Sequence, residues 1–422
     1  MRSRRRLFGA CLAAVFAFLA VAGGVLVTWL PDCPGRCPNV ANASHPAAMV
    51  LPAPEPARIS VLPAPKSTGV SPAAPVRVSA YSGRLTSVSM VNESGTVIPG
   101  RLAADGLSWR PDEQLGYGRL YTMTISAQGP TGVPSTQTAS FSTVSPDNQA
   151  QLSLRMSSGI PIAQGGVYGI GAVISARFDE PIRDRIAAES RMNVRTAPPV
   201  SGSWNWIDDQ TAHWRPERYY APGTRVTIDA PMYGARLGNG VYGAQDESVS
   251  FVIGAAHRSV ADDKTKQISV YDGDRLVRTM PTSMGMGGTE TIGGTTLSFW
   301  TPPGIYSVLD KGNPVVMDSS TFGLPVNSRL GYKLSIPWAT RISTDGIYLH
   351  QLNATIWAQG SRNLSHGCLN LSGENAEWFF NFSQPGDIVE VVGTGGPGLT
   401  LHQGGDWSVP YAVWRKGSAL GV

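Results

Sequence analysis

The chain has 422 residues, of which only 15% are charged, and it contains 48 glycines and 32 prolines. Long charged helices are therefore scarce, and this composition favours short strands separated by turns. The formal net charge of +4 is spread thinly, with no basic cluster beyond the first residues, which argues against nucleic acid as a partner. The length is enough for two or three domains.

The N-terminus predicts export. Arginines at positions 2 and 4–6 precede residues 7–30, a stretch of 24 residues without a charged side chain. Positive residues stay on the cytoplasmic side, and this length can cross a bilayer. We expect a single-pass anchor in the cell membrane, with the rest of the chain in the periplasm or cell-wall space. Secretion after signal cleavage is the alternative.

Residues 31–57 are rich in proline and alanine and predict a flexible stalk. Cys33 and Cys37 lie in it. They could form a disulfide in an oxidising compartment or remain free thiols, and the spacing leaves both readings open.

Two units of about 100 residues follow, and an internal sequence repeat relates them. Trp-Arg-Pro occurs at 109–111 and again at 214–216, and a glycine follows each tryptophan by nine residues. Alternating apolar residues, as at 76–79 and 174–178, put one face of each strand in a core. The repetition predicts two Ig-like β-sandwiches, with one short helical insertion between Ile182 and Met192.

The pattern changes from Ala255. Residues 267–271 and 275–278 flank Asp-Gly-Asp, which predicts a hairpin. Ser372 is a plausible N-cap for a helix that continues to Phe382, and residues 387–392 predict a buried strand. The aromatic residues between Asp406 and Trp414 form an apolar patch that should pack on a neighbour.

Cys368 is the only cysteine after residue 37. It belongs to the segment 365–370 (Ser-His-Gly-Cys-Leu-Asn), and 14 residues separate His350 from that segment. A thiolate is a good nucleophile, and an imidazole can take its proton, whereas Gly367 lets backbone and substrate approach closely. A lone cysteine is by default a buried structural residue. The pattern thus gives a candidate nucleophile with two candidate bases, His350 and His366.

One cysteine in the folded part does not supply the cysteine and histidine spacing of a zinc site. We therefore expect neither a metal nor any other cofactor.

The two-part motif of His350 and residues 365–370 resembles the signature of the YkuD-type L,D-transpeptidases. Segments 280–285, 317–321, 325–328 and 387–392 are also similar to the mycobacterial-type members, which carry two Ig-like domains before the catalytic domain. The resemblance covers roughly residues 60–420. It implies a mainly β protein in which two Ig-like sandwiches precede a catalytic β-domain with a short helix. The expected segments are an anchor or signal at 1–30, a stalk at 31–57, Ig-like domains at 58–146 and 147–254, a catalytic domain at 255–395, and a C-terminal subdomain at 396–422 that packs on the catalytic domain.

The resemblance also implies an activity, the formation of 3→3 cross-links between peptidoglycan stem peptides. The donor would be a tetrapeptide stem that releases D-Ala, and the acceptor would be the side-chain amine of a diamino acid. Carbapenem-type β-lactams would be covalent inhibitors. Cys368 would be the nucleophile and His350 the base, oriented by the backbone carbonyl of Gln351. The Tyr332 hydroxyl and the N–H groups around Gly367 would stabilise the oxyanion.

Further residues of the expected site come from the same resemblance. Asp345, Gly346 and Asn370 would hold the donor stem. The remaining substrate-binding candidates are Ser365, Met317, Phe322 and Trp357. Trp357 could line the cleft or fill the small core of its own loop, and both readings stay open. The stretch from 289 to 322 could be a lid or an ordinary hairpin.

The sequence departs from the family pattern at the expected pocket. Relatives have tyrosine where this chain has Phe322, and tryptophan at the position of Ala354. Two other activities remain compatible with the sequence. One is an L,D-carboxypeptidase that trims tetrapeptide stems by using water as the acceptor. The other is a non-catalytic wall-binding scaffold, since Ig-like domains often serve as spacers or binding modules.

Overall fold

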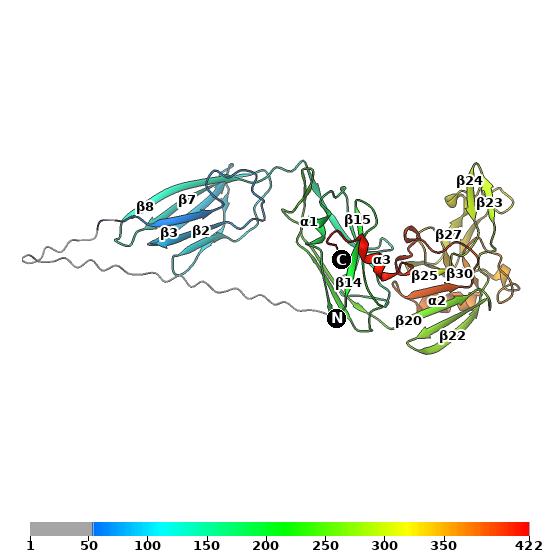
Figure 1. Cartoon of the computed structure of the whole chain (residues 1–422). Helices are drawn as coiled ribbons and strands as arrows, with labels where there is room; N and C mark the ends of the chain where they lie inside the picture. The colour runs from blue at the N-terminus through cyan, green and yellow to red at the C-terminus, as the bar shows by residue number, and fades with distance from the viewer. Residues whose placement is uncertain (1–52, 54, 422) are drawn as a thin grey trace, which may run out of the picture. The chain divides into compact units, whose positions relative to one another are not determined.

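The computed structural model describes residue 53 and residues 55–421 (Figure 1). The expected anchor, most of the expected stalk, and Cys33 and Cys37 lie outside these residues. Among the residues that are described, no helix is both long and apolar enough to cross a bilayer. The described chain is mainly β, as the sequence predicts.

The first sandwich consists of two four-stranded antiparallel sheets around one core. One sheet has the order β1-β2-β6-β5 and the other β4-β3-β7-β8. Their bounds are β1 Arg58–Leu62, β2 Arg77–Ser82, β3 Arg84–Asn92, β4 Val97–Ile98, β5 Gly100–Leu102, β6 Ser108–Pro111, β7 Leu120–Gln128 and β8 Pro134–Ser142. Alternate residues such as Val76 and Val78 are buried, which confirms the predicted alternation.

The second sandwich contains the sheets β10-β12-β15-β14 and β11-β19-β16-β13, with a small sheet β17-β18-β9 at its edge. The strands are β9 Asn148–Ala150, β10 Leu152–Met156, β11 Gly166–Tyr168, β12 Ile174–Phe178, β13 Asn193–Ala197, β14 Gly202–Trp206, β15 Thr211–Pro216, β16 Arg225–Ala230, β17 Arg236–Gly238, β18 Val241–Gly243 and β19 Glu247–Ile253. The short helical insertion is confirmed as α1 (Arg185–Glu189), capped by the side chain of Asp184.

The two tryptophans of the internal sequence repeat occupy equivalent positions in the two sandwiches. Trp109 and Trp214 are both buried in their sandwiches. A Cβ at Gly100 would lie 2.2 Å from the ring of Trp109, and a Cβ at Gly202 would lie 2.1 Å from the ring of Trp214. Each sandwich therefore needs a glycine opposite its tryptophan, which supports the interpretation that one domain was repeated.

The domain from residue 255 is built on two larger sheets and two hairpins. The sheets have the orders β22-β21-β20-β32-β25 and β26-β29-β30-β31, and the hairpins are β23-β24 and β27-β28. The strands are β20 His257–Asp262, β21 Gln267–Asp272, β22 Arg275–Pro281, β23 Thr289–Ile292, β24 Thr295–Ser298, β25 Gly304–Ser307, β26 Asp310–Gly312, β27 Val315–Asp318, β28 Lys333–Ile336, β29 Ala339–Arg341, β30 Tyr348–Gln351, β31 Leu369–Leu371 and β32 Ile388–Val392. The predicted hairpin β21-β22 and the buried strand β32 are both confirmed.

Helix α2 (Gly373–Phe382) begins where the sequence predicts. The Ser372 side chain accepts a hydrogen bond from the N–H of Asn375 at 3.3 Å, as an N-cap does. The buried residues of α2, Ala376 and Phe379, belong to the same core as residues of β20, β21 and β32. This core fixes the sheet that carries the site described below.

The C-terminal segment has contacts in two domains. Residues 397–403 lie against the catalytic domain, and the residues that follow contact both this domain, through Ser408 and Ile305, and the second sandwich. The indole N–H of Trp407 donates to the carbonyl of Gly171 at 2.8 Å, and that of Trp414 donates to the carbonyl of Ser203 at 2.9 Å. The segment 396–422 thus contacts the second sandwich as well as the catalytic domain, and its assignment as a C-terminal subdomain stays a prediction.

The reason lies in Arg215 on β15. Its guanidinium lies 4.6 Å from the ring centre of Trp407 and 4.7 Å from that of Trp414, and it donates to the carbonyl of Val409. A cation over aromatic rings is attractive, most of all where water is excluded. Arg215 thus attaches the aromatic segment to the second sandwich, in addition to the contacts that the segment makes with the catalytic domain.

Candidate active site

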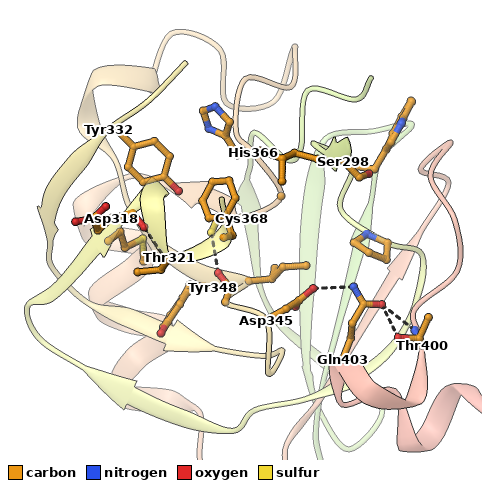
Figure 2. A pocket seen from close by; sticks show the side chains of 18 of the residues that line it. Ser298, Asp318, Thr321, Tyr332, Asp345, Tyr348, His366, Cys368, Thr400 and Gln403 are labelled. Carbon is orange, nitrogen blue, oxygen red and sulfur yellow. Dashed lines mark hydrogen bonds between the residues drawn. The ribbon is translucent and has the colours of Figure 1, made fainter. Parts of the chain in front are cut away.

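Two cavities meet at Cys368 in the domain from residue 255. The larger has a volume of about 410 Å³ and the smaller about 350 Å³. Both are lined by Met317, Tyr332, His366 and Cys368. Figure 2 shows Tyr332 and His366 close to Cys368, with Asp345, Gln403 and Thr400 on another side of the larger cavity.

Strand pairing brings Cys368 and His350 to one face. Strand β30 pairs in parallel with β31, and His350 lies opposite Asn370 in the register. Side chains alternate between the faces of a sheet, so Cys368, two residues before Asn370, is on the same face as Asn370 and His350. All three line the smaller cavity. The residues between the two parts of the motif therefore connect two neighbouring strands, and these strands present the three side chains on one face.

His350 is held as a neutral imidazole with a defined tautomer. Its Nδ1 lies 2.9 Å from the carbonyl oxygen of Gln351, and since a carbonyl only accepts, Nδ1 carries the proton. Burial lowers the pKa of His350 to about 4. The other ring nitrogen, Nε2, is thus unprotonated near neutral pH and able to accept a proton. This is the backbone contact that the resemblance implies for Gln351.

Cys368 is a thiol in this environment. Burial, supported by the charge of Asp345, raises the pKa of the Cys368 thiol to about 11. The thiol donates to the carbonyl oxygen of Gly346, with Sγ 3.7 Å from that oxygen. The pair of Cys368 and His350 is therefore neutral at rest, and the proton has to leave sulfur as the sulfur attacks an electrophile.

The turn before Cys368 is fixed by hydroxyl groups. Ser365 Oγ accepts from the N–H of Gly367 at 3.0 Å and donates to the carbonyl of Cys368 at 2.6 Å. Thr301 Oγ1 donates to the carbonyl of Gly367 at 2.7 Å. Gly367 has a φ of +140°, which other residues rarely adopt. Ser365 thus shapes the turn, and Thr301 is a supporting residue that no motif in the sequence indicated.

Tyr332 presents a hydroxyl donor beside Cys368. Burial raises the pKa of Tyr332, so its hydroxyl keeps its proton over the ordinary pH range. Its backbone N–H donates to Ser319 Oγ at 2.9 Å, which fixes the start of β28 against the 3-10 helix η1 (Ser319–Phe322). Phe322, which follows on η1, has its ring centre 6.2 Å from that of Tyr332 and lines the larger cavity.

Asn370 and His366 carry buried polar atoms that have no protein partner. Both polar atoms of the Asn370 amide and Nε2 of His366 are in this state among the described residues. Burying such groups without a partner is costly, and both side chains line a cavity at Cys368. Their hydrogen-bonding capacity is therefore unused in this structure. His366 packs edge-on against Phe299, with 4.9 Å between the ring centres. His350 instead has its Nδ1 proton fixed on a carbonyl oxygen, which leaves Nε2 free to act as a base.

Comparisons with known proteins show the family of this chain. Residues 256–391 match the family model of the L,D-transpeptidase catalytic domain, and residues 67–236 match that of a bacterial Ig domain. The chain is 42% identical over 354 residues to L,D-transpeptidase 2 of Mycobacterium tuberculosis, covering 84% of this chain and 83% of that protein. The chain belongs to the L,D-transpeptidases.

Other relatives extend over similar lengths. L,D-transpeptidase 5 of Mycobacterium tuberculosis is 34% identical over 412 residues, which is 96% of this chain and 85% of that protein. Among solved structures, L,D-transpeptidase 3 from Mycobacterium tuberculosis in complex with a faropenem-derived adduct is 30% identical. That match covers 57% of this chain and 98% of the other, with a TM-score of 0.44.

The stretch expected to be a lid or a hairpin contains the hairpin β23-β24 in this L,D-transpeptidase. Residues 296–298 of this hairpin and Trp300 line the larger cavity. Leu297 is buried with Phe299 and Leu324 in a small cluster of its own. The hairpin is therefore a wall of the cavity.

Trp357 is not brought to the site. It lines neither cavity at Cys368, and 66% of its surface is exposed, so it does not fill a core within its loop either. The guanidinium of Arg362 lies 5.5 Å from its ring centre. The sequence left open whether Trp357 lines the cleft or fills the core of its loop, and the structure shows it in neither place.

Gln403 is a residue of the cavity that sequence reasoning missed. It lies in the 3-10 helix η3 (Leu401–Gln403), and its Nε2 donates to the carboxylate of Asp345 at 2.7 Å (Figure 2). Pro397, Gly398 and Thr400 of the same segment also line the larger cavity. No sequence motif marks these residues. The sequence predicted only that the aromatic residues after Gly405 pack on a neighbour.

Within the described residues, no group of three or more His, Cys, Asp or Glu side chains could hold a metal ion. The site can be explained by the thiol, the imidazole and the hydrogen-bond donors described above.

Proposed function

We propose that this L,D-transpeptidase forms 3→3 cross-links between peptidoglycan stem peptides through an acyl-enzyme on Cys368. The observation that carries the proposal is the position of the thiol, between two cavities and on the same strand face as a neutral, oriented His350. A transferase needs room for a donor and an acceptor at one sulfur, whereas a hydrolase needs only a donor and water.

Acylation uses the groups in place. Sγ of Cys368 attacks the carbonyl carbon of the diamino acid at position 3 of the donor stem, and its proton passes to Nε2 of His350. The Tyr332 hydroxyl and the N–H of Cys368 are suited to stabilise the oxyanion that forms. The bond to D-Ala then breaks, D-Ala leaves with the proton from His350, and a thioester remains.

Transfer reverses the roles. The amine of the acceptor attacks the thioester carbonyl and gives a proton to His350, which returns it to sulfur as the new amide bond forms. His350 lines the smaller cavity and not the larger one. We therefore assign the acceptor to the smaller cavity and the donor to the larger. Carbapenem-type β-lactams should acylate the same sulfur, because their strained carbonyl is an electrophile of the same kind.

The proposed location is the cell membrane, with the folded part of the chain on its outer side, because the charge and apolarity of residues 1–30 predict an anchor; secretion after signal cleavage is the alternative. The location is tested by fractionating cells and detecting the protein in each fraction with an antibody to the second sandwich. Protein in the membrane fraction with its bulk accessible to external protease supports an anchor, and protein free in the medium supports cleavage.

The activity is tested by incubating the full-length protein, solubilised in detergent, with disaccharide-tetrapeptide and analysing the products by mass spectrometry. A cross-linked dimer and release of D-Ala are expected. Tripeptide without dimer would identify an L,D-carboxypeptidase instead. Cys368→Ala is expected to abolish both product formation and the covalent carbapenem adduct. Absence of turnover and of any adduct in the unmodified protein would favour the non-catalytic scaffold.

A further inference from the structure

Asp345 is fixed beside the candidate nucleophile. It lies in the turn between β29 and β30, and its Oδ1 accepts a hydrogen bond from Ser343 Oγ. Its Oδ2 accepts from Gln403 Nε2 at 2.7 Å. The next residue, Gly346, provides the carbonyl oxygen that the Cys368 thiol contacts. The carboxylate therefore has a fixed position in the larger cavity, one residue from the group that touches sulfur.

Gln403 is itself held in one orientation. Its Oε1 accepts from the backbone N–H of Thr400 at 3.0 Å and from the Thr400 hydroxyl at 2.8 Å. An amide oxygen that accepts from a backbone N–H cannot be exchanged with the NH₂ group, so Nε2 has to face Asp345. The Thr344 hydroxyl also donates to the carbonyl of His402 at 2.6 Å. Helix η3 thus contacts both Thr344 and Asp345 of the turn.

The carboxylate of Asp345 lacks a cationic partner in the described part of the chain. No Lys, Arg or His nitrogen there lies within 4.0 Å of it, whereas the other carboxylate of the cavity, Asp318, has Lys333 at 3.0 Å. Each oxygen of Asp345 already accepts one hydrogen bond from a neutral donor and has capacity for more. A fixed anion of this kind in a cavity favours a cationic group of the ligand.

We propose that Asp345 binds the protonated side-chain amine of the diamino acid of the donor stem, and that Gln403 is the positioning residue that holds the carboxylate for it. The inference rests on the proposed function. In that reaction the attacked carbonyl and the side-chain amine belong to the same residue of the donor. The amine therefore lies within one side-chain length of the attacked carbonyl, and Asp345 lines the cavity that also contains Cys368.

Binding of an ammonium group here also affects the nucleophile. Asp345 contributes to the raised pKa of the Cys368 thiol, after the larger effect of burial. A bound ammonium offsets that negative charge and makes the loss of the thiol proton easier. The correct donor would thus promote its own attack, and a stem without the free amine would not.

The test uses the full-length protein and two synthetic tetrapeptide stems that differ only in the side-chain amine, free in one and N-acetylated in the other. Acylation of Cys368 is followed by mass spectrometry to give KM and kcat for each stem. For a partly exposed ion pair we expect KM about five-fold lower for the free amine. Asp345→Asn, which is nearly isosteric, should remove this preference by raising KM for the free amine only.

Gln403→Ala should reduce the same preference, because the carboxylate loses the donor that positions it. The ratio of the two KM values is a readout that a general loss of stability does not change. The matched control is Gln245→Ala in the second sandwich, where Gln245 donates to the carboxylate of Glu247 far along the chain from the site. This control should keep the ratio of the unmodified protein.

Equal KM values for the two stems in the unmodified protein would overturn this inference alone. The same conclusion follows if Asp345→Asn keeps the full preference for the free amine. No acylation by either stem would overturn the proposed function and this inference with it.

Discussion

The guanidinium of Arg215, on a strand of the second sandwich, lies 4.6 Å from the ring centre of Trp407, in the segment that follows the catalytic domain. Four residues before Trp407, Gln403 contacts Asp345 in the larger cavity. His213, two residues before Arg215, also pairs with Asp406 at 2.7 Å. One short segment is therefore attached to the second sandwich at one end and to the active-site turn at the other.

Truncation of Trp414 should destabilise the protein. The side chain is 1% exposed, donates to Ser203 and packs beside Arg215. Removal of a buried tryptophan costs about 3–5 kcal/mol in unfolding free energy. We expect Trp414→Ala to lower the midpoint of thermal unfolding measured by circular dichroism. Trp357→Ala is the control, since an exposed ring of this kind should change stability by less than about 0.5 kcal/mol. Equal midpoints for the two variants would contradict the packing described here.

The sequence predicts those parts of the fold that depend on local patterns. The repeated Trp-Arg-Pro marks two sandwiches because each tryptophan needs the same glycine opposite it. Ser372 marks the start of α2 because an N-cap acts on the next turn. The motif predicts that His350 lies close to Cys368, because His350 is on β30 and Cys368 directly precedes the adjacent parallel strand β31.

The sequence does not predict contacts that depend on which surfaces meet. The aromatic patch around Trp407 indicates that it should be buried, but not that Arg215 of another domain covers it. Gln403 enters the cavity through a 3-10 turn without a motif, so nothing distinguishes it from other glutamines. Trp357 appears suited to a cleft by residue type, whereas its placement depends on the path of the whole loop after His350.

Cys368 should react slowly with a small alkylating agent at neutral pH. Only the thiolate reacts, and the pKa of about 11 leaves very little thiolate at pH 7. Alkylation by iodoacetamide should therefore rise about ten-fold per pH unit and level off only near pH 11. The rate is measured on the peptide that contains Cys368 by mass spectrometry, which separates it from other cysteines. A plateau already at pH 7 would show that the resting pair is ionised.

Acylation by the donor stem should follow a different pH profile, because His350 then takes the proton. The productive form has a neutral imidazole and a protonated thiol. A lowered histidine pKa of about 4 keeps the imidazole neutral down to mildly acidic pH, so activity is lost only as pH falls through about 4. Single-turnover acylation should be nearly constant from about pH 5 to pH 9. His350→Gln should lower this rate by about 10²- to 10⁴-fold. A midpoint near pH 6.5 in the unmodified protein would contradict the buried, neutral state.

Tyr332→Phe should slow acylation without weakening the binding of the stem. Phe322, the neighbouring aromatic residue of the same wall, has no hydroxyl, so Tyr332 supplies the phenol on this side of Cys368. Loss of one oxyanion donor costs about 10²-fold in kcat, and KM should change little because the donor acts mainly on the transition state.

Tyr348→Phe is the matched control for this variant. Tyr348 lines the same larger cavity, and burial also raises its pKa, but Figure 2 shows its ring directed away from Cys368. Its kcat should stay within about two-fold of that of the unmodified protein. If Tyr332→Phe and Tyr348→Phe had the same kcat, the oxyanion would have to be stabilised by the backbone N–H of Cys368 without the phenol.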